Sequence, residues 1–342
     1  MTIRGKYIEV CRYTGVLGIL FVMISSYQQK PLNEYHIDGY AQGTTYHITY
    51  FAKDSLLRKK DIDLLFNKLD SSLSIYKSYS VINKFNSSDK GIYIDQHLSR
   101  VVNRSLEIYK DTKGSFDITV YPLVSAWGFG NKKIDELPDS AKIKSLLDCV
   151  GSDKLQLVNQ RLSKKSPCVQ IDVNGIAQGY SVDVIAQWIE RKGIKTYLVE
   201  VGGEIRVSGK KPDGSFMRIG VESPAVNNND EPIIRKVIAL NKGAVTTSGS
   251  YRKYIESGGT RITHLIDPKT GYSIKSDMVS VTVIAKDAIT ADGYDNPLMA
   301  MDINSAIEFA GKRSLDAYFI YRKENGELAD TATAGFYKLV KQ

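Results

Sequence analysis

The chain has 342 residues, 42% of them hydrophobic and 25% charged, which is enough to bury a core as one large domain or two smaller ones and excludes a disordered chain or a membrane bundle. Of the net charge of +8, the first thirty residues carry +3 and the rest +5. The other basic residues are spread among acidic ones without an aromatic-interleaved stripe, so no nucleic-acid surface is indicated, although a small polyanionic ligand stays open.

The N-terminal segment has the plan of an export signal. Three basic residues precede an apolar run from Val16 to Ile24, which is followed by Ser25 and Ser26. The run is short for a membrane span, and no cysteine follows it that could carry a lipid. The serines form a poor cleavage site, so a removed signal and an uncleaved anchor both stay open. Both predict an exported protein, periplasmic or anchored in the inner membrane and facing the periplasm. We expect residues 1–34 to be this segment and residues 35–342 to be the functional domain.

Apolar periodicity then predicts alternating strands and helices. Residues 46–51 alternate as in a strand, and the apolar residues of 62–69 follow the spacing of an amphipathic helix. Further helices are expected over 98–109 with Ser99 as a cap, 140–150, 182–189, from 288 onward and over 303–310, and further strands over 196–201, 204–208, 217–221, 237–240 and 279–284. The stretch 227–231 is rich in Asn and predicts a loop. Most strands are joined as hairpins, which favours an α+β fold around a mixed or mostly antiparallel sheet over a doubly wound parallel one.

Two cysteines, Cys149 and Cys168, lie beyond the N-terminal segment. In an oxidising compartment they could form a disulfide, although two free or buried thiols fit the sequence equally well. The chain has no C-x-x-C pair, so a cysteine-bound metal is not expected.

The segment Ile171–Asp183 joins a strand end to a helix through Asn174 and Gly175. Such a turn aims unpaired backbone N–H groups outward, and the helix dipole adds positive potential, so the segment predicts an anion site with phosphate as its guest. Gly175 and Gly179 lie four residues apart, which leaves one helical face open to a ligand or to another backbone. A packed turn with a helix–helix contact is the alternative. The segment is neither a P-loop nor a dinucleotide fingerprint.

A second signal lies in the helix after the strand 279–284. Asp292 and Asn296 are four residues apart and share a helical face, so a carboxylate and an amide oxygen could grip one hard cation, for which Mg²⁺ is the natural candidate. The alternative is a solvated surface Asp with capping near Pro297. Because proline clashes with the preceding turn, we expect Asn296 to lie at a break in the helix.

Two more segments suggest oxyanion or phosphate contacts. The stretch Ala244–Tyr251 is rich in hydroxyl groups, and Thr263–Gly271 places His264 and Asp267 before a turn. A structural imidazole is the alternative for His264.

Taken together, these segments resemble the ApbE-type flavin transferases, the FAD:protein FMN transferases. The resemblance spans nearly all of the expected exported domain through collinear segments at Gln42–Thr44, Ser74–Tyr76, Gly114–Gly130, Asp172–Tyr180, Val201–Gly203, Thr247–Tyr251, His264–Gly271 and Ala291–Met301. It implies an ApbE-like (T-fold-like) architecture. It also implies that FAD binds as substrate in a cleft with Mg²⁺ on its pyrophosphate, and that the FMN half passes to a threonine hydroxyl of an acceptor protein while AMP leaves.

The resemblance also implies a set of site residues. Flavin contacts would fall on Gln42, Ile75, Gly114, Ser115, Phe116, Asp172, Gln178 and Ile266, metal ligands on Gly175, Asp292 and Asn296, and catalytic roles on His264 and Asp292. Gly175 can ligate only through its carbonyl oxygen. The chain departs from the family pattern at Asn296, where Thr is usual, at Gln178, where Lys or Glu is common, and at Ile75, where Thr is frequent.

The expected partners are FAD and acceptor flavoprotein subunits of envelope electron-transfer complexes, with membrane association through the N-terminus. Two other functions stay open. One is a Mg²⁺-dependent FAD pyrophosphatase that gives FMN and AMP, with water in place of the threonine. The other is a non-catalytic FAD-binding protein of the envelope.

Overall fold

The computed structural model describes residues 31–131, 134–223, 233–250, 254–257 and 260–341. Residues 1–30 of the expected export segment and the expected loop at 227–231 lie outside these ranges. The part from Leu32 to Gln342 forms one compact unit. Within the described ranges, no helix combines the length and the apolar character that a membrane crossing requires.

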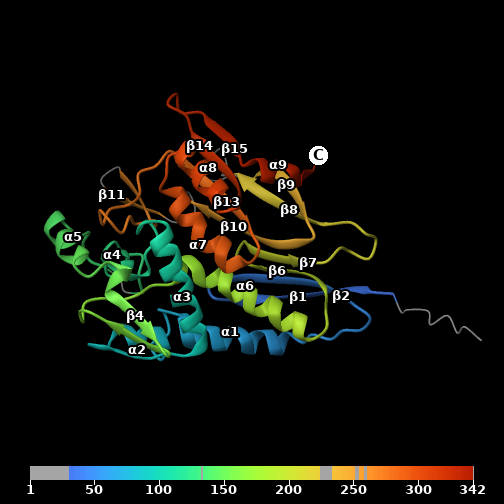
Figure 1. Cartoon of the computed structure of the whole chain (residues 1–342), viewed down its shortest axis with the longest axis horizontal. Helices are drawn as coiled ribbons and strands as arrows, with labels where there is room; N and C mark the ends of the chain where they lie inside the picture. Colours follow the sequence, from blue (N-terminus) through green and yellow to red (C-terminus); the bar gives the residue numbers. More distant parts are fainter. Residues whose placement is uncertain (1–30, 132–133, 224–232, 251–253, 258–259, 342) are drawn as a thin grey trace, which may run out of the picture. The chain divides into compact units, whose positions relative to one another are not determined.

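Within the described residues, the central element is an eight-stranded sheet (Figure 1) in the order β1-β2-β6-β7-β10-β13-β14-β15. Every described pairing is antiparallel, which confirms the expected α+β class. The strands span Asn33–Ala41 (β1), Thr44–Ala52 (β2), Thr196–Val201 (β6), Glu204–Ser208 (β7), Lys242–Gly249 (β10), Met278–Ala285 (β13), Asp316–Arg322 (β14) and Leu328–Ala332 (β15).

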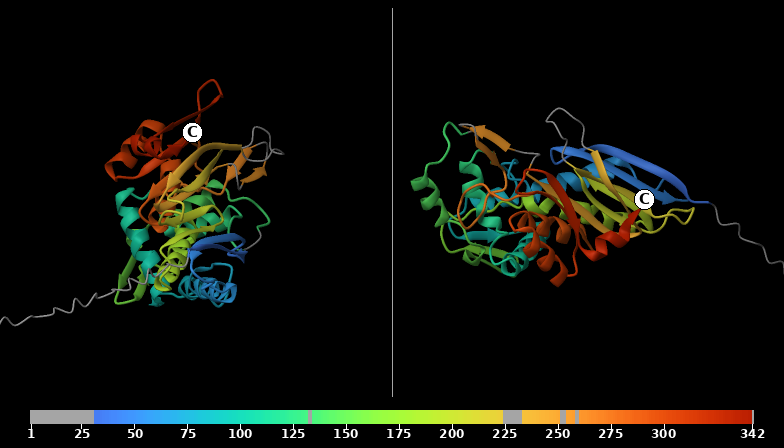
Figure 2. Two further views of the ribbon diagram at one scale, coloured as in Figure 1. Left: turned by 90° about the vertical axis from the view of Figure 1, so that its right-hand side faces the viewer. Right: turned by 90° about the horizontal axis from the view of Figure 1, so that it is seen from above.

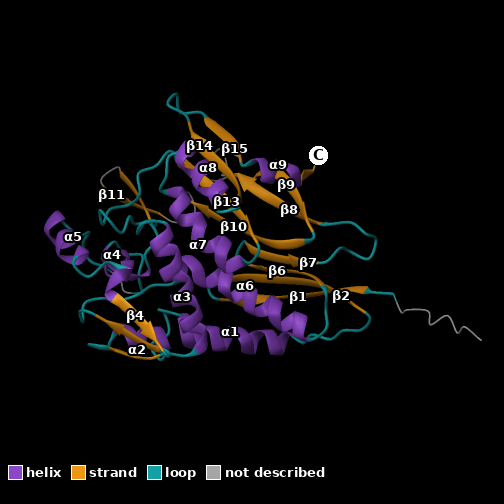
Figure 3. Cartoon of the chain, in the orientation of Figure 1, coloured by secondary structure: helices purple, strands orange, loops and turns teal. Residues whose placement is uncertain are grey.

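Helices cover one face of this sheet. They are α1 (Lys59–Leu73), α6 (Asn174–Arg191), α7 (Ala288–Met299) and α8 (Ile303–Lys312), and α3 (Gln96–Asp111) packs on α1, α6 and α7. Helices α6 and α7 pack on each other and on β6, β7, β10 and β13, as Figure 3 shows. The left view of Figure 2 shows α1 end on, beside the blue strands β1 and β2. The main apolar core lies between this face of the sheet and the helices, where Tyr46, Ile48 and Val281 are at most 1% exposed.

A smaller sheet in the order β16-β9-β8 packs with α9 on the opposite face. Its elements span Met217–Ser223 (β8), Ile233–Leu240 (β9), Ala334–Leu339 (α9) and Val340–Lys341 (β16). The alternation along β8 buries Met217, Ile219 and Val221 against a second apolar cluster that includes Ile284 and Tyr318 of the large sheet. The two sides of the large sheet therefore have separate cores.

The remaining elements lie beside the ends of α3 and α6. They are α2 (Val81–Asn86), β3 (Gly91–Tyr93), η1 (Ile118–Val120), α4 (Tyr121–Ala126), α5 (Ser140–Leu147), η2 (Ser152–Lys154), β4 (Leu155–Val158), β5 (Arg161–Lys164) and the hairpin β11 (Tyr254–Ser257) with β12 (Thr260–Thr263). A disulfide joins Cys149 to Cys168, which settles the alternative that the sequence left open.

One expected helix start is wrong. Helix α3 begins at Gln96, and its cap is Asp95, whose carboxylate accepts the N–H of Leu98 at 2.9 Å. Ser99 lies inside the first turn. The periodic apolar residues alone did not reveal the earlier start, because Gln96 and His97 extend the helix without adding to its buried face.

We expect the disulfide to contribute about 3 kcal/mol to the free energy of unfolding, since it closes a loop with a sequence separation of 19 residues. The double substitution Cys149→Ser and Cys168→Ser should therefore lower the stability by about that amount. Urea denaturation of the oxidised protein and of the double variant measures this difference. Equal midpoints for the two proteins would contradict the bond.

Candidate active site

Residues spaced four apart form the contact between α6 and α7, which we call the α6–α7 interface. They are Gly175, Gly179 and Asp183 on α6, and Ala288, Asp292 and Asn296 on α7. A Cβ atom on Gly179 would lie 2.4 Å from the carbonyl oxygen of Ala288 and 2.7 Å from the Cβ of Asp292. The two backbones therefore meet at a distance that only glycine permits. At Gly179 the chain therefore forms a helix–helix contact, which was the alternative to an open face for a ligand.

Each of the two helices supplies a carboxylate to the other. Asp183 of α6 accepts the N–H groups of Ala288 and Ile289 at 3.0 and 2.9 Å and so satisfies the first turn of α7. Arg206 of β7 donates to the same carboxylate. In return, Asp292 of α7 accepts the N–H of Gly179 at 2.7 Å. These bonds fix the spacing and the register of the α6–α7 interface.

Three acidic side chains of α6 and α7 are buried, namely Asp183, Asp292 and Asp295. Asp292 is 5% exposed, so the alternative of a solvated surface Asp is wrong. Burial, with a smaller contribution from Asp183, raises the pKa of Asp292 to about 7. Burial, Asp292 and Glu204 also raise the pKa of Asp295 well above its ordinary value. One oxygen of Asp295 accepts from Thr246 at 3.0 Å, and among the described residues the other has no hydrogen-bond partner. Burial thus favours the protonated forms of Asp292 and Asp295, and a cation beside Asp292 would favour its ionised form.

The expected metal ligands meet at the open end of the interface. Gly175 has φ −81° and ψ 15°, which interrupts the helix, and a Cβ on it would lie 2.9 Å from the amide nitrogen of Asn296. The amide oxygen of Asn296 accepts from Ser248 at 2.7 Å. A half-turn of this amide would direct its oxygen toward Gly175 and its N–H₂ group toward Ser248, since both orientations satisfy the hydroxyl.

The donor set fits Mg²⁺. A carboxylate, an amide oxygen and a main-chain carbonyl are hard oxygen ligands, and Mg²⁺ usually completes its octahedron with waters and substrate phosphates. No cluster of three or more His, Cys, Asp or Glu suited to a metal occurs within the described ranges. Since Asp292 is the single carboxylate among the expected ligands, we expect cation affinity to depend on the bound diphosphate.

The expected break at Pro297 is absent. Helix α7 continues through Pro297 to Met299. Proline removes one N–H donor, and the helix needs only one further turn before its cap at Ala300, so burial of Leu298 and Met299 against the core holds this turn in place. Asn296 therefore projects from a regular helix.

The N-terminus of α6 is less open than the sequence suggested. Asp172 accepts the N–H of Asn174 at 2.8 Å, and the N–H groups of Ile176 and Ala177 bond to the carbonyl of Val173. The chain itself therefore satisfies several of the N–H groups that were expected to bind an anion. Asp172 is 8% exposed and lies directly before the turn that carries Gly175.

Several expected flavin contacts surround this end of α6. The ring of Phe116 would lie 3.8 Å from a Cβ on Gly175, and Gly114 and Ser115 precede it in the chain. Gln178 donates to the carbonyl of Val201 at 2.9 Å. In the turn between β1 and β2, Gln42 has φ 53° and donates to Ser181 of α6 at 3.0 Å.

Three expected residues lie in other surroundings. Ile75 is fully buried in the main core, and its carbonyl accepts from Asn83 and Asn131 at 2.9 and 2.6 Å. Ile266 belongs to a third apolar cluster near α4 and α5. His264 follows β12 and meets the ring of Phe129 edge to face, with centroids 6.3 Å apart.

The structure also shows a polar cavity that the sequence did not reveal. It measures about 180 Å³ and is lined by Asn83, Asn86, Ser87, Tyr121, Ser125, Asn131 and Gln170. These residues come from segments that are distant in sequence, so no local pattern could have predicted that they line one cavity. The cavity adjoins the backbone of Ile75 and Ile171, where Asn131 and Asn86 donate to the carbonyl oxygens at 2.6 and 2.9 Å.

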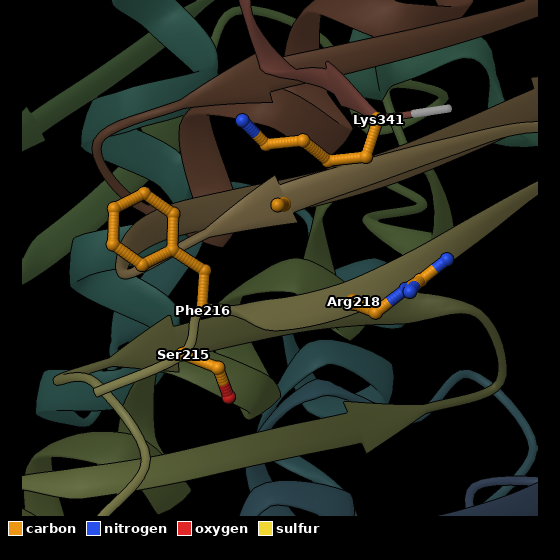
Figure 4. Close-up of a pocket in the computed structure, with 5 residues that line it drawn as sticks. Ser215, Phe216, Arg218 and Lys341 are labelled. Atoms are coloured by element: carbon orange, nitrogen blue, oxygen red, sulfur yellow. The ribbon is translucent and has the colours of Figure 1, made fainter. Parts of the chain in front are cut away.

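A second cavity, of about 320 Å³, lies on the smaller sheet (Figure 4). It is lined by Ser215, Phe216, Arg218, Ala239 and Lys341. None of the expected site residues belongs to it, so its position gives no support to a role in flavin or phosphate chemistry.

Gly179→Ala should push α6 and α7 apart, because the new methyl group would overlap the carbonyl of Ala288. We expect a loss of about 2 kcal/mol in the free energy of unfolding. Gly311→Ala in α8 is the matched control, since a Cβ there meets nothing within 4 Å, and it should stabilise the protein by up to about 1 kcal/mol. Chemical denaturation measures both; equal effects of the two variants would refute the close approach.

The chain is similar to known proteins over most of its length. The sequence profile of the ApbE family matches residues 42–319. The FAD:protein FMN transferase of Haemophilus influenzae is 33% identical over 96% of this chain and 98% of that protein. That of Vibrio cholerae serotype O1 is 34% identical over 87% and 90%.

Solved structures show the same fold. The flavin transferase ApbE from Vibrio cholerae superposes with a TM-score of 0.81 at 32% identity, over 90% of this chain and 100% of that one. The apo flavinyl transferase ApbE of Pseudomonas stutzeri gives 0.80 at 31% identity, over 90% and 97%. Since the profile, the relatives and the structures all match over most of its length, the chain belongs to the ApbE family.

Proposed function

We propose that the protein is a Mg²⁺-dependent FAD:protein FMN transferase, which moves the FMN moiety of FAD to a threonine hydroxyl of an acceptor protein and releases AMP. One observation carries the proposal. The α6–α7 interface brings Gly175 beside Asn296 and holds Asp292 one turn away on the same helix, in a buried contact. Relatives named FAD:protein FMN transferase, which match over most of the chain, support the same reaction.

The reaction is a phosphoryl transfer. The threonine oxygen forms a bond to the phosphorus of the FMN half, the bond from that phosphorus to the bridging oxygen breaks, AMP leaves with the bridging oxygen, and the hydroxyl proton is released. Transition states of this kind are loose, so positioning and charge compensation matter more than a strong base. When bound, Mg²⁺ supplies positive charge that offsets the charge growing on the leaving phosphate.

The chain's own residues position these groups. Asp292 would hold the cation, while the Gly175 carbonyl and the Asn296 amide would orient it. The bond from Gly179 to Asp292 and the cap from Asp183 fix that carboxylate before any substrate binds. Phe116 beside Gly175 provides an apolar wall. The site therefore has the rigidity that phosphoryl transfer requires.

His264 is proposed to act on the acceptor hydroxyl, as a base or as a group that positions it. The imidazole lies against Phe129, on the segment that leads into Ile266. We further propose that the protein acts outside the cytoplasm, in the periplasm or anchored by its N-terminal segment, on flavoprotein subunits of envelope electron-transfer complexes.

Asp292→Asn keeps the shape of the side chain but removes the single carboxylate among the proposed ligands. We expect flavinylation to fall by at least about 100-fold, because the neutral amide compensates the cation poorly. Asp277→Asn, at an exposed position outside the site, is the control and should transfer at the wild-type rate. In-gel fluorescence of covalent flavin measures transfer, and thermal melting checks that both variants fold. An unchanged rate in Asp292→Asn would refute the metal assignment.

The products separate the proposal from its alternatives. Wild-type protein is incubated with FAD, Mg²⁺ and a threonine-bearing acceptor, and the flavin and adenine products are quantified. We expect AMP together with covalently labelled acceptor. FMN with AMP and no labelled acceptor would replace the transferase by a pyrophosphatase. Neither product, with FAD bound, would replace it by a flavin-binding protein.

His264→Ala tests the second catalytic assignment. We expect a lower transfer rate at all pH values and the loss of one ionisation from the profile of rate against pH, since the substituted side chain no longer titrates. FAD affinity should change little, and fluorescence quenching of the flavin checks it. A profile identical to that of the wild type would remove His264 from the mechanism.

A further inference from the structure

A lysine stands at the edge of the proposed flavin site without a role so far. The Nζ of Lys269 donates to the hydroxyl of Ser115 at 3.2 Å, and its Cε would lie 3.8 Å from a Cβ on Gly114. The lysine is exposed. It comes from the turn after Ile266, about 150 residues along the chain from the segment it touches, so the fold rather than local sequence creates this contact.

The turn that carries Lys269 is held by several independent bonds. Asp267 accepts the N–H of Lys269 at 2.9 Å and the hydroxyl of Thr270 at 3.0 Å, and the N–H of Gly271 bonds to the carbonyl of Asp267 at 2.8 Å. From another segment, the indole of Trp127 donates to the carbonyl of Gly271 at 2.7 Å. A turn fixed in this way presents its lysine in a defined direction.

A short series of contacts links this lysine to the metal ligands. Ser115 is followed by Phe116, whose ring would lie 3.8 Å from a Cβ on Gly175, and the amide of Asn296 would lie 2.9 Å from the same position. Lys269 therefore contacts the segment Gly114–Phe116, and the same segment borders the expected metal ligands. Gly114 has φ 81°, and a Cβ at this position would lie 3.4 Å from the ring of Tyr109.

The charge of Lys269 is available to a ligand. No ion pair joins it to a carboxylate of the described residues, and both oxygens of nearby Asp267 already accept hydrogen bonds within the turn. An ammonium group has three donors, of which Ser115 takes one. The diphosphate of FAD carries about two negative charges at neutral pH and several acceptor oxygens, which suits the two remaining donors.

We propose that Lys269 is a phosphate-binding residue of the flavin site, which contacts the diphosphate of FAD. This inference rests on the proposed function for the identity of the ligand. The ammonium group of Lys269 would add a second positive charge to that of the cation. The turn Asp267–Gly271 would hold this group beside Ser115.

The test is a set of affinities measured by titration calorimetry on the intact protein with Mg²⁺. The ligands are FAD, ADP as a diphosphate without flavin, and riboflavin as a flavin without phosphate. Lys269→Gln should lower the affinity for FAD and for ADP by roughly tenfold, because a charge-assisted bond to phosphate is lost. The affinity for riboflavin should stay unchanged. Lys269→Arg should keep most of the affinity. Added salt should weaken ADP binding less in Lys269→Gln than in the wild type.

Lys275→Gln, at an exposed position on the segment after the same turn, is the matched control and should bind all three ligands as the wild type does. Thermal melting shows whether Lys269→Gln disturbs the turn. Equal affinities of Lys269→Gln and the wild type for ADP and FAD would overturn the inference. A loss of riboflavin affinity as large as the loss for FAD and ADP would overturn it as well. A wild type that binds ADP through Lys269 but transfers no flavin would sustain the inference while refuting the proposed function.

Discussion

The close approach of α6 and α7 is the constraint on which the rest of the site depends. Gly179 lets the two backbones meet, and the carboxylates of Asp183 and Asp292 cross between the helices in opposite directions. Because each carboxylate bonds to backbone N–H groups, the arrangement depends little on side-chain rotamers of the partner helix. It also leaves Gly175 and Asn296 facing each other at the end of the contact. The large sheet supports both helices from one side, through β6, β7, β10 and β13.

This arrangement has an electrostatic cost that a ligand would relieve. Asp183 has Arg206 beside it, whereas burial and Asp183 raise the pKa of Asp292, and burial, Asp292 and Glu204 raise that of Asp295. A bound divalent ion would stabilise the folded state by an amount that grows with the logarithm of its concentration over its dissociation constant. A cation beside Asp292 would therefore favour the ionised form of this carboxyl group, which burial alone disfavours.

The sequence predicted the parts of this structure that follow from local pattern. The strand at 46–51, the helix at 62–69 and the spacing of Asp292 and Asn296 were all visible, since periodicity and four-residue spacing are local signals. The ends of elements were less certain, as Asp95 shows, because a cap is a single residue. Long-range placements had no such signal. Asp183 caps a helix more than a hundred residues later, and Lys269 meets Ser115 across a similar distance. Asp183 does follow Gly175 and Gly179 at intervals of four, which could have marked it.

The bond between Cys149 and Cys168 has a consequence for how the chain reaches its native state. The remaining cysteine of the sequence, Cys11, lies in the N-terminal segment. Within residues 31–342 the two sulfurs have only each other as partners, so oxidation of this part of the chain can yield one isomer and no reshuffling step is needed. The residues they join are close in sequence, and the loop can therefore close before the long-range strands pair.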